Sequence, residues 1–88
     1  MATYLVERYW PGLDPASVQA ATDRLLASGV VVVETIVASV DEVCYWYVAA
    51  GSADDVERTF RTAGVRLDRV AAATALGHDR GDGSDAPT

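Results

Sequence analysis

The spacing of hydrophobic positions alternates along the chain between the twofold spacing of strands and the wider spacing of helices. Segments dense in β-branched and aromatic residues predict four strands. These segments are residues 2–10, 30–40, 43–49 and 65–76. Asp41 and Glu42 are the turn-like pair between the second and third segments, so we expect a tight hairpin there.

Two segments between the strands carry apolar residues at helical spacing. The first begins at Asp14 and Pro15. Asp14 can accept hydrogen bonds from the free N–H groups of a helix N-terminus, and Pro15 suits the first helical turn. This segment ends before Gly29. The second follows Ser52, which with the carboxylate three residues later forms an acidic variant of the capping box, and it ends at Gly64.

The resulting order, β-α-β-β-α-β, is typical of the ferredoxin-like fold. It predicts the α+β class, with a four-stranded antiparallel sheet and two helices on one face. We expect residues 1–76 to form this single domain. Residues 77–88 are rich in Gly, Asp and Ser without an apolar period, and they predict a flexible C-terminal tail.

The strand predicted at residues 43–49 has two apolar faces, because side chains alternate along a strand. One face holds Cys44, Trp46 and Val48, and the other holds Val43, Tyr45, Tyr47 and Ala49. The second strand is alike, with Val31, Val33, Thr35 and Val37 on one side and Val30, Val32, Ile36 and Ala38 on the other. Glu34 is its polar exception.

Two helices cover one face of such a sheet and leave the other apolar face to be covered. Three well-buried side chains on that face would contribute about 5–9 kcal/mol. That is comparable to the whole stability of a small domain. We therefore expect a second copy of the chain to cover it, as in a dimeric α+β barrel, while a bent sheet hidden by the tail or loops is the alternative.

The composition of the chain limits the classes of binding partner and the cellular location that we expect. The 88-residue chain has a net charge of −6, and its seven basic residues are all Arg. This acidity argues against nucleic acid and against an anionic membrane surface as partners. Cys44 has no second cysteine to pair with, and the N-terminal residues show no signal-peptide pattern. A cytoplasmic location is expected.

Several short motifs resemble those of a family of small bacterial proteins, a domain-of-unknown-function family with a nickel-binding member. The motifs are Tyr4-Leu5-Val6-Glu7-Arg8, Pro11-Gly12, Cys44 with aromatic neighbours, Ala63-Gly64 and Asp68-Arg69-Val70. The likeness runs from Tyr4 to Val70. It implies a ferredoxin-like homodimer whose two sheets face each other as an α+β barrel.

The resemblance also bears on metal binding. The nickel-binding members carry His after the first-strand motif and in each helix. The corresponding stretches here hold Arg8 and Tyr9, then Ala20 and Ala21, and then Phe60. The histidine of this chain, His78, lies outside the matching region. We therefore predict no metal-ligating residues.

Four residues are candidates for a ligand-binding pocket: Glu7, Tyr9, Cys44 and Trp46. Glu7, on the first strand, could hold a ligand or act as a catalytic general base, or it could pair with an Arg such as Arg69. Cys44 could be a soft ligand or a nucleophile, or a buried inert thiol. Trp46 and the nearby tyrosines could stack on a flat ligand, or form core and dimer interface.

Three functional hypotheses remain open from the residues alone. The first is a small homodimeric ligand- or metal-binding protein with a pocket between the sheets. The second is a cofactor-independent enzyme of the dimeric α+β barrel type, such as a cyclase, isomerase or small monooxygenase, with Glu7 as base. The third is an interaction module without a pocket. No Gly-rich phosphate loop follows a strand, which argues against ATP or NAD, and the sequence identifies no cofactor.

Overall fold

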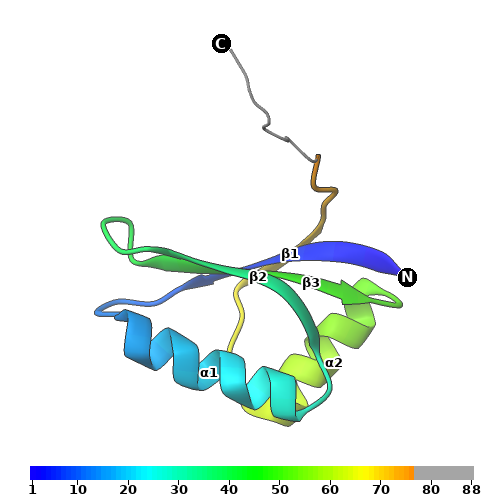
Figure 1. Cartoon of the computed structure of the whole chain (residues 1–88), viewed down its shortest axis with the longest axis horizontal. Helices are drawn as coiled ribbons and strands as arrows, with labels where there is room; N and C mark the ends of the chain where they lie inside the picture. Colours follow the sequence, from blue (N-terminus) through cyan, green and yellow to red (C-terminus); the bar gives the residue numbers. More distant parts are fainter. Residues whose placement is uncertain (77–88) are drawn as a thin grey trace.

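The computed structural model describes residues 1–76, and the predicted tail and His78 lie outside these described residues. The elements are β1 (Ala2–Tyr9), α1 (Pro15–Ala27), β2 (Val31–Ala38), β3 (Val43–Ala50), α2 (Ala53–Ala63) and β4 (Arg69–Ala72). The strands form one antiparallel sheet in the order β2-β3-β1-β4. Both helices lie on the same side of it (Figure 1). The predicted α+β class and element order are confirmed.

The helix ends follow the predicted chemistry. The Asp14 side chain accepts a bond from the backbone N–H of Ser17 at 2.8 Å, and Ser52 caps α2 by accepting from a backbone N–H at 3.1 Å. Gly29 and Gly64, which end the two helices, have φ values of +88° and +73°. Both glycines thus adopt the left-handed conformation that other residues disfavour.

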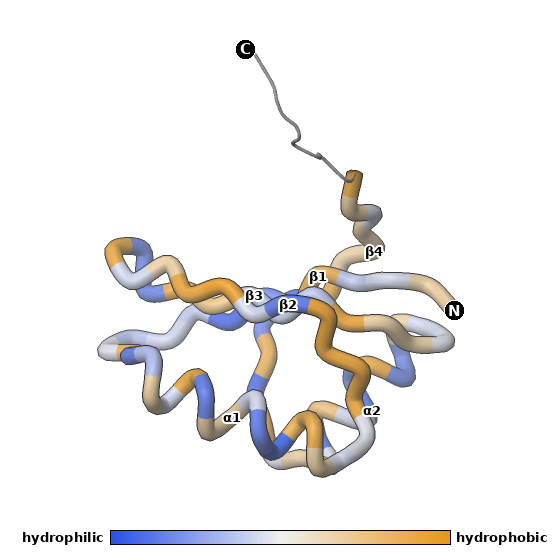
Figure 2. Tube along the Cα trace, viewed as in Figure 1, coloured by the Kyte–Doolittle hydropathy of each residue, from blue (hydrophilic) through white to orange (hydrophobic). Residues whose placement is uncertain are grey.

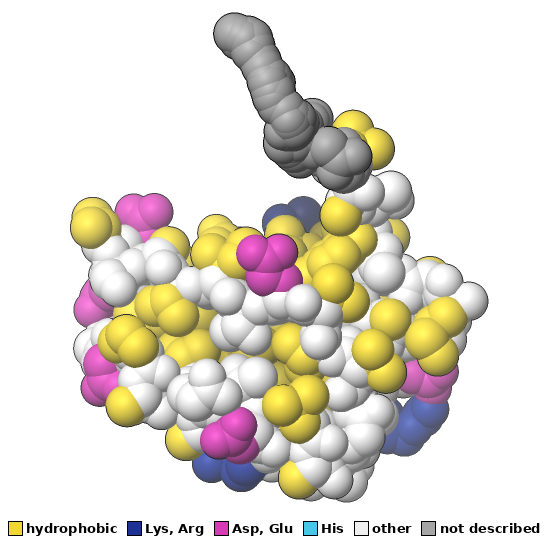
Figure 3. Space-filling model, in the orientation of Figure 1, with side chains coloured by type: hydrophobic (Ala, Val, Ile, Leu, Met, Phe, Trp, Pro, Cys, Tyr) yellow, Lys and Arg dark blue, Asp and Glu magenta, His cyan; other side chains and the backbone are white. Residues whose placement is uncertain are grey.

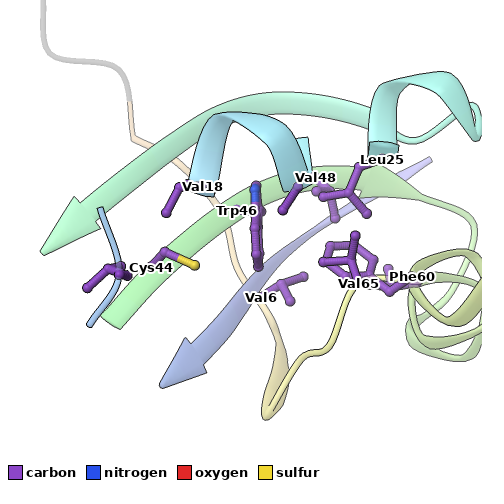
Figure 4. Close-up of a cluster of buried hydrophobic side chains, with 11 residues drawn as sticks. Val6, Val18, Leu25, Cys44, Trp46, Val48, Phe60 and Val65 are labelled. Carbon is purple, nitrogen blue, oxygen red and sulfur yellow. The ribbon is translucent and has the colours of Figure 1, made fainter. Parts of the chain in front are cut away.

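The hydrophobic core lies between the sheet and the helices (Figure 4). Its residues are Val6, Leu13, Val18, Ala21, Leu25, Cys44, Trp46, Val48, Val56, Phe60 and Val65. The rings of Trp46 and Phe60 meet edge to face, with centroids 5.5 Å apart. The β3 side chains Cys44, Trp46 and Val48 all enter this core, so the predicted alternation of β3 is confirmed.

β4 is shorter than the predicted strand over residues 65–76. It pairs with β1 only from Arg69 to Ala72. Val65 is instead buried in the core, directly after the turn at Gly64. The segment before β4 therefore closes the end of α2 rather than extending the sheet.

A β-bulge at Val33 corrects the predicted faces of β2. Val32 lies opposite Val48, but Glu34 lies opposite Tyr47, so Val33 is an extra residue on its strand. The extra residue reverses the alternation beyond it. The residues that share the face of Tyr47 are Val31, Glu34, Ile36 and Ala38, whereas Val32, Thr35 and Val37 face the helices.

We call the face of the sheet that is turned away from the helices the open face.

No helix among residues 1–76 has both the length and the hydrophobicity needed to span a membrane.

Candidate functional site

The structure divides the four candidate pocket residues between the two faces of the sheet. Residues directly opposite each other on paired strands share a face. Glu7 lies opposite Tyr45, and Tyr9 is on the same face two residues along. Cys44 and Trp46 face the helices and are fully buried in the core. The prediction that all four line one pocket is therefore wrong, because strand alternation separates Glu7 and Tyr9 from the other two.

The open face is largely apolar. Its side chains are Thr3, Leu5, Glu7 and Tyr9 of β1, Val43, Tyr45, Tyr47 and Ala49 of β3, Val31, Glu34, Ile36 and Ala38 of β2, and Arg69 and Ala71 of β4. Val31 and Ile36 keep 51% and 45% of their surface exposed. Hydrophobic side chains gather along the sheet in Figure 3, with an acidic one among them.

One row of side chains crosses all four strands and contains an ion pair. Ile36, Tyr45, Glu7 and Arg69 lie opposite one another in succession. The Oε1 atom of Glu7 is 3.8 Å from Nη1 of Arg69, and the Glu7 side chain is 35% exposed. The predicted alternative of a Glu7–Arg69 pair is thus what the structure shows. A carboxylate beside a tyrosine ring and an arginine can position a polar group of a ligand on an otherwise apolar surface.

A hydrogen-bonded chain ties the last described residues to the open face. The Tyr47 hydroxyl donates to Oγ1 of Thr3 at 3.0 Å and accepts from the backbone N–H of Ala75 at 2.9 Å. Thr3 in turn donates to the carbonyl of Ala73 at 2.5 Å. Sequence reasoning missed this arrangement, because no local pattern signals which backbone groups a surface tyrosine will bind.

Cys44 lies in an environment that suppresses thiol chemistry. Burial raises the pKa of Cys44 to about 11, although the positive charge of Arg8 opposes this shift. Arg8 lies opposite Cys44 and stacks its guanidinium on the ring of Trp10 at 3.7 Å, and burial lowers the Arg8 pKa. The thiol is therefore protonated at neutral pH, which fits the inert interpretation.

Two cavities in the described residues lie away from the four candidates. One, of about 470 Å³, is an open groove along the C-terminal half of α2 and the residues that follow it. The other, of about 240 Å³, lies between β2, the end of β3 and α2. Glu7, Tyr9, Cys44 and Trp46 line neither of them. Within residues 1–76, no three His, Cys, Asp or Glu side chains cluster closely enough to hold a metal ion.

Among solved structures, the chain is similar to SCO4226 from Streptomyces coelicolor A3(2). The TM-score is 0.76 at 18% sequence identity, and the match covers 86% of this chain and 100% of SCO4226. No family model matches the chain, and no curated protein matches it. The chain thus shares the fold of SCO4226, while its family remains a prediction from the motifs.

Proposed function

We propose that this chain works as a homodimer whose two open faces pack together and enclose a binding site for a small molecule. The apolar character of a face that no helix covers is the observation that carries the proposal. Val31, Ile36 and Tyr9 each keep about half of their surface in water in the single chain. Exposed apolar patches of this kind mark interaction sites in soluble proteins.

The size of the open face is adequate for a dimer. Strands about 4.8 Å apart with a rise of about 3.3 Å per residue give a face of up to about 19 by 26 Å. Two such faces together would bury at most about 1,000 Å², which is near the threshold expected of a biological interface. Stacked sheets lie about 10 Å apart, so large and small side chains on the two faces decide whether space remains between them.

The row through Tyr45, Glu7 and Arg69 is the proposed ligand site. Closure by a second sheet would shield the Glu7–Arg69 pair from water, which strengthens its interactions with polar groups. A small organic molecule with a flat apolar body and a hydrogen-bonding group fits this combination of ring and charge.

Binding is favoured over catalysis by the contact that Glu7 makes. An enzyme that takes up a proton and returns it elsewhere on the substrate commonly places a second titratable group beside its general base. Among the described residues, the ion-pair partner of Glu7 is the guanidinium of Arg69, which carries hydrogen-bond donors and no acceptor. The alternative role of Glu7 as the general base of a cofactor-independent enzyme therefore has less support than a role in holding a ligand.

Sedimentation equilibrium and native mass spectrometry test the proposal together. The full chain should sediment at about twice its 9.3 kDa mass. Protein taken directly from its host should show an added small mass on the dimer, and Glu7→Gln should lose that mass. A chain that stays monomeric, or a dimer that carries the same adduct in wild type and Glu7→Gln, would contradict the proposal.

A further inference from the structure

The two edge strands carry opposite charges on the open face. Glu34 lies on β2 and Arg69 on β4, and the order β2-β3-β1-β4 puts them three strand spacings apart. At about 4.8 Å per spacing, the two backbones are about 14 Å from each other. Glu34 and Arg69 of one chain therefore do not meet directly.

Burial of the open face in a dimer would leave the Glu34 carboxylate without a charged partner from its own chain. Glu34 forms no ion pair within residues 1–76, whose salt bridges are Arg58–Asp55, Arg66–Asp68 and Arg69–Glu7. It also interrupts the apolar residues of β2, as the hydrophilic middle of that strand shows in Figure 2. Taking a carboxylate out of water without a partner is costly, so the dimer must supply one.

Arg69 has donors to spare for that role. Its side chain is 72% exposed, and one nitrogen contacts Glu7 at 3.8 Å. A guanidinium carries five N–H donors and can serve two carboxylates at once.

Two sheets can face each other about a two-fold axis in two simple ways. An axis parallel to the strands places β2 over the β4 strand of the second copy, and an axis across the strands places β2 over β2. The second arrangement brings Glu34 near its own copy, where like charges repel. The first brings each edge carboxylate over an edge arginine.

The register along the strands permits the first arrangement. Glu34 lies in the same row as Ala71, and Arg69 is two residues from Ala71 along β4. Two residues span about 7 Å. The long side chain of an arginine bridges such a step across stacked sheets.

We infer that the second copy docks with the two-fold axis parallel to the strands, so that Glu34 of each copy pairs with Arg69 of the partner subunit. This inference rests on the proposed dimer and specifies its orientation. An isologous interface makes the contact twice, once at each edge, and encloses the row of Tyr45 and Glu7 between the two pairs. Electrostatic complementarity then sets the register of an interface whose centre is apolar.

A double-mutant cycle with Glu34→Gln, Arg69→Gln and the double variant tests the orientation. Each single change should raise the dimer Kd by about tenfold, as for charge pairs at interfaces. The Kd of the double variant should exceed the wild-type Kd by far less than the product of the two single-variant increases. Because the residues are about 14 Å apart within one chain, such coupling must cross the interface. The loss of the Arg69–Glu7 ion pair in Arg69→Gln changes the Kd equally with Glu34 present or replaced, so it cancels in the coupling energy.

Glu57→Gln and Arg61→Gln provide the matched control, because both residues are exposed on α2, on the other side of the sheet. The Kd should not change in these variants or in their double. A wild-type chain that is monomeric at about 0.1 mM would remove the dimer itself. A dimeric wild type with additive effects, or a tighter dimer in Glu34→Gln, would leave the dimer standing and overturn the orientation.

Discussion

The indole Nε1–H of Trp46 donates a hydrogen bond of 2.9 Å to Oγ1 of Thr22, and both side chains are buried. The Thr22 hydroxyl in turn donates a hydrogen bond of 2.8 Å to the backbone carbonyl of Val18. The largest core side chain is thereby anchored to α1 through a polar contact inside an apolar environment. This contact gives the helix a defined position over β3.

Replacing Thr22 by Val should destabilise the fold by about 1–3 kcal/mol, because the Trp46 N–H is left buried without an acceptor. Thr22→Ser keeps the hydroxyl and should cost less than Thr22→Val. Urea unfolding at one fixed protein concentration measures both. Equal losses in the two variants would show that the lost contact is packing rather than the hydrogen bond.

Cys44 predicts a loss of stability at alkaline pH. Its pKa is raised from 9.0 to about 11, so the unfolded chain gives up the thiol proton first as the pH rises. The stabilising effect is complete below pH 9.0 and is lost as the pH passes through about 11. The full effect is about 2–3 kcal/mol.

Comparison of wild type with Cys44→Ala isolates this effect from the titration of tyrosines. Their difference in unfolding free energy should shrink between pH 9.0 and about 11. A thiol-specific reagent at about pH 8 should leave the folded wild type unmodified and react once urea unfolds it. Rapid modification of the folded chain would contradict the buried, protonated state.

The bulge at Val33 predicts an unusual tolerance to deletion. Without Val33, Val32 and Glu34 become neighbours and still point to the faces they occupy now. Deletion of Val33 should therefore cost no more than about 1 kcal/mol, the typical loss for a single mutation.

Deletion of Thr35 is the matched control, since it shortens the same strand by one residue. A regular β2 would then turn Glu34 toward the helices, and burying that carboxylate should cost about 3 kcal/mol or more. Circular dichroism and urea unfolding of the two deletions provide the comparison. Similar stability in both would show that the face pattern of β2 does not depend on the bulge.

The contact of Tyr47 with the C-terminal segment predicts a local effect on exchange. Tyr47→Phe removes the acceptor of the Ala75 N–H. Loss of a hydrogen bond worth about 1 kcal/mol should speed exchange of the Ala75 amide by roughly fivefold. Core amides should keep their protection, and hydrogen exchange followed by NMR resolves the two.

Tyr45→Phe controls for the loss of a hydroxyl on the same strand and face. Its hydroxyl forms no side-chain hydrogen bond within residues 1–76, so the Ala75 amide should exchange at the wild-type rate. A faster rate in both variants would point to a change of the whole open face instead of one lost acceptor.

Local chemistry in the sequence was sufficient for the order of the elements and for the ends of the two helices. Asp14 and Ser52 cap the helices, and Gly64 adopts a positive φ where the pattern predicts the end of α2. These features depend on hydrogen bonds and conformations within a few residues, so they can be read from neighbouring letters. The twofold alternation of β3 likewise placed Cys44 and Trp46 on one face.

Only the tertiary structure decided which candidates share a site. Glu7 and Tyr9 were separated from Cys44 and Trp46 because pairing between β1 and β3 fixes the face of each residue. The bulge at Val33 reversed the face of Glu34, since it arises from the register of two strands and leaves no mark in composition. Element identity is thus a local property of this chain, whereas the grouping of Glu7 with Arg69 depends on non-local strand register.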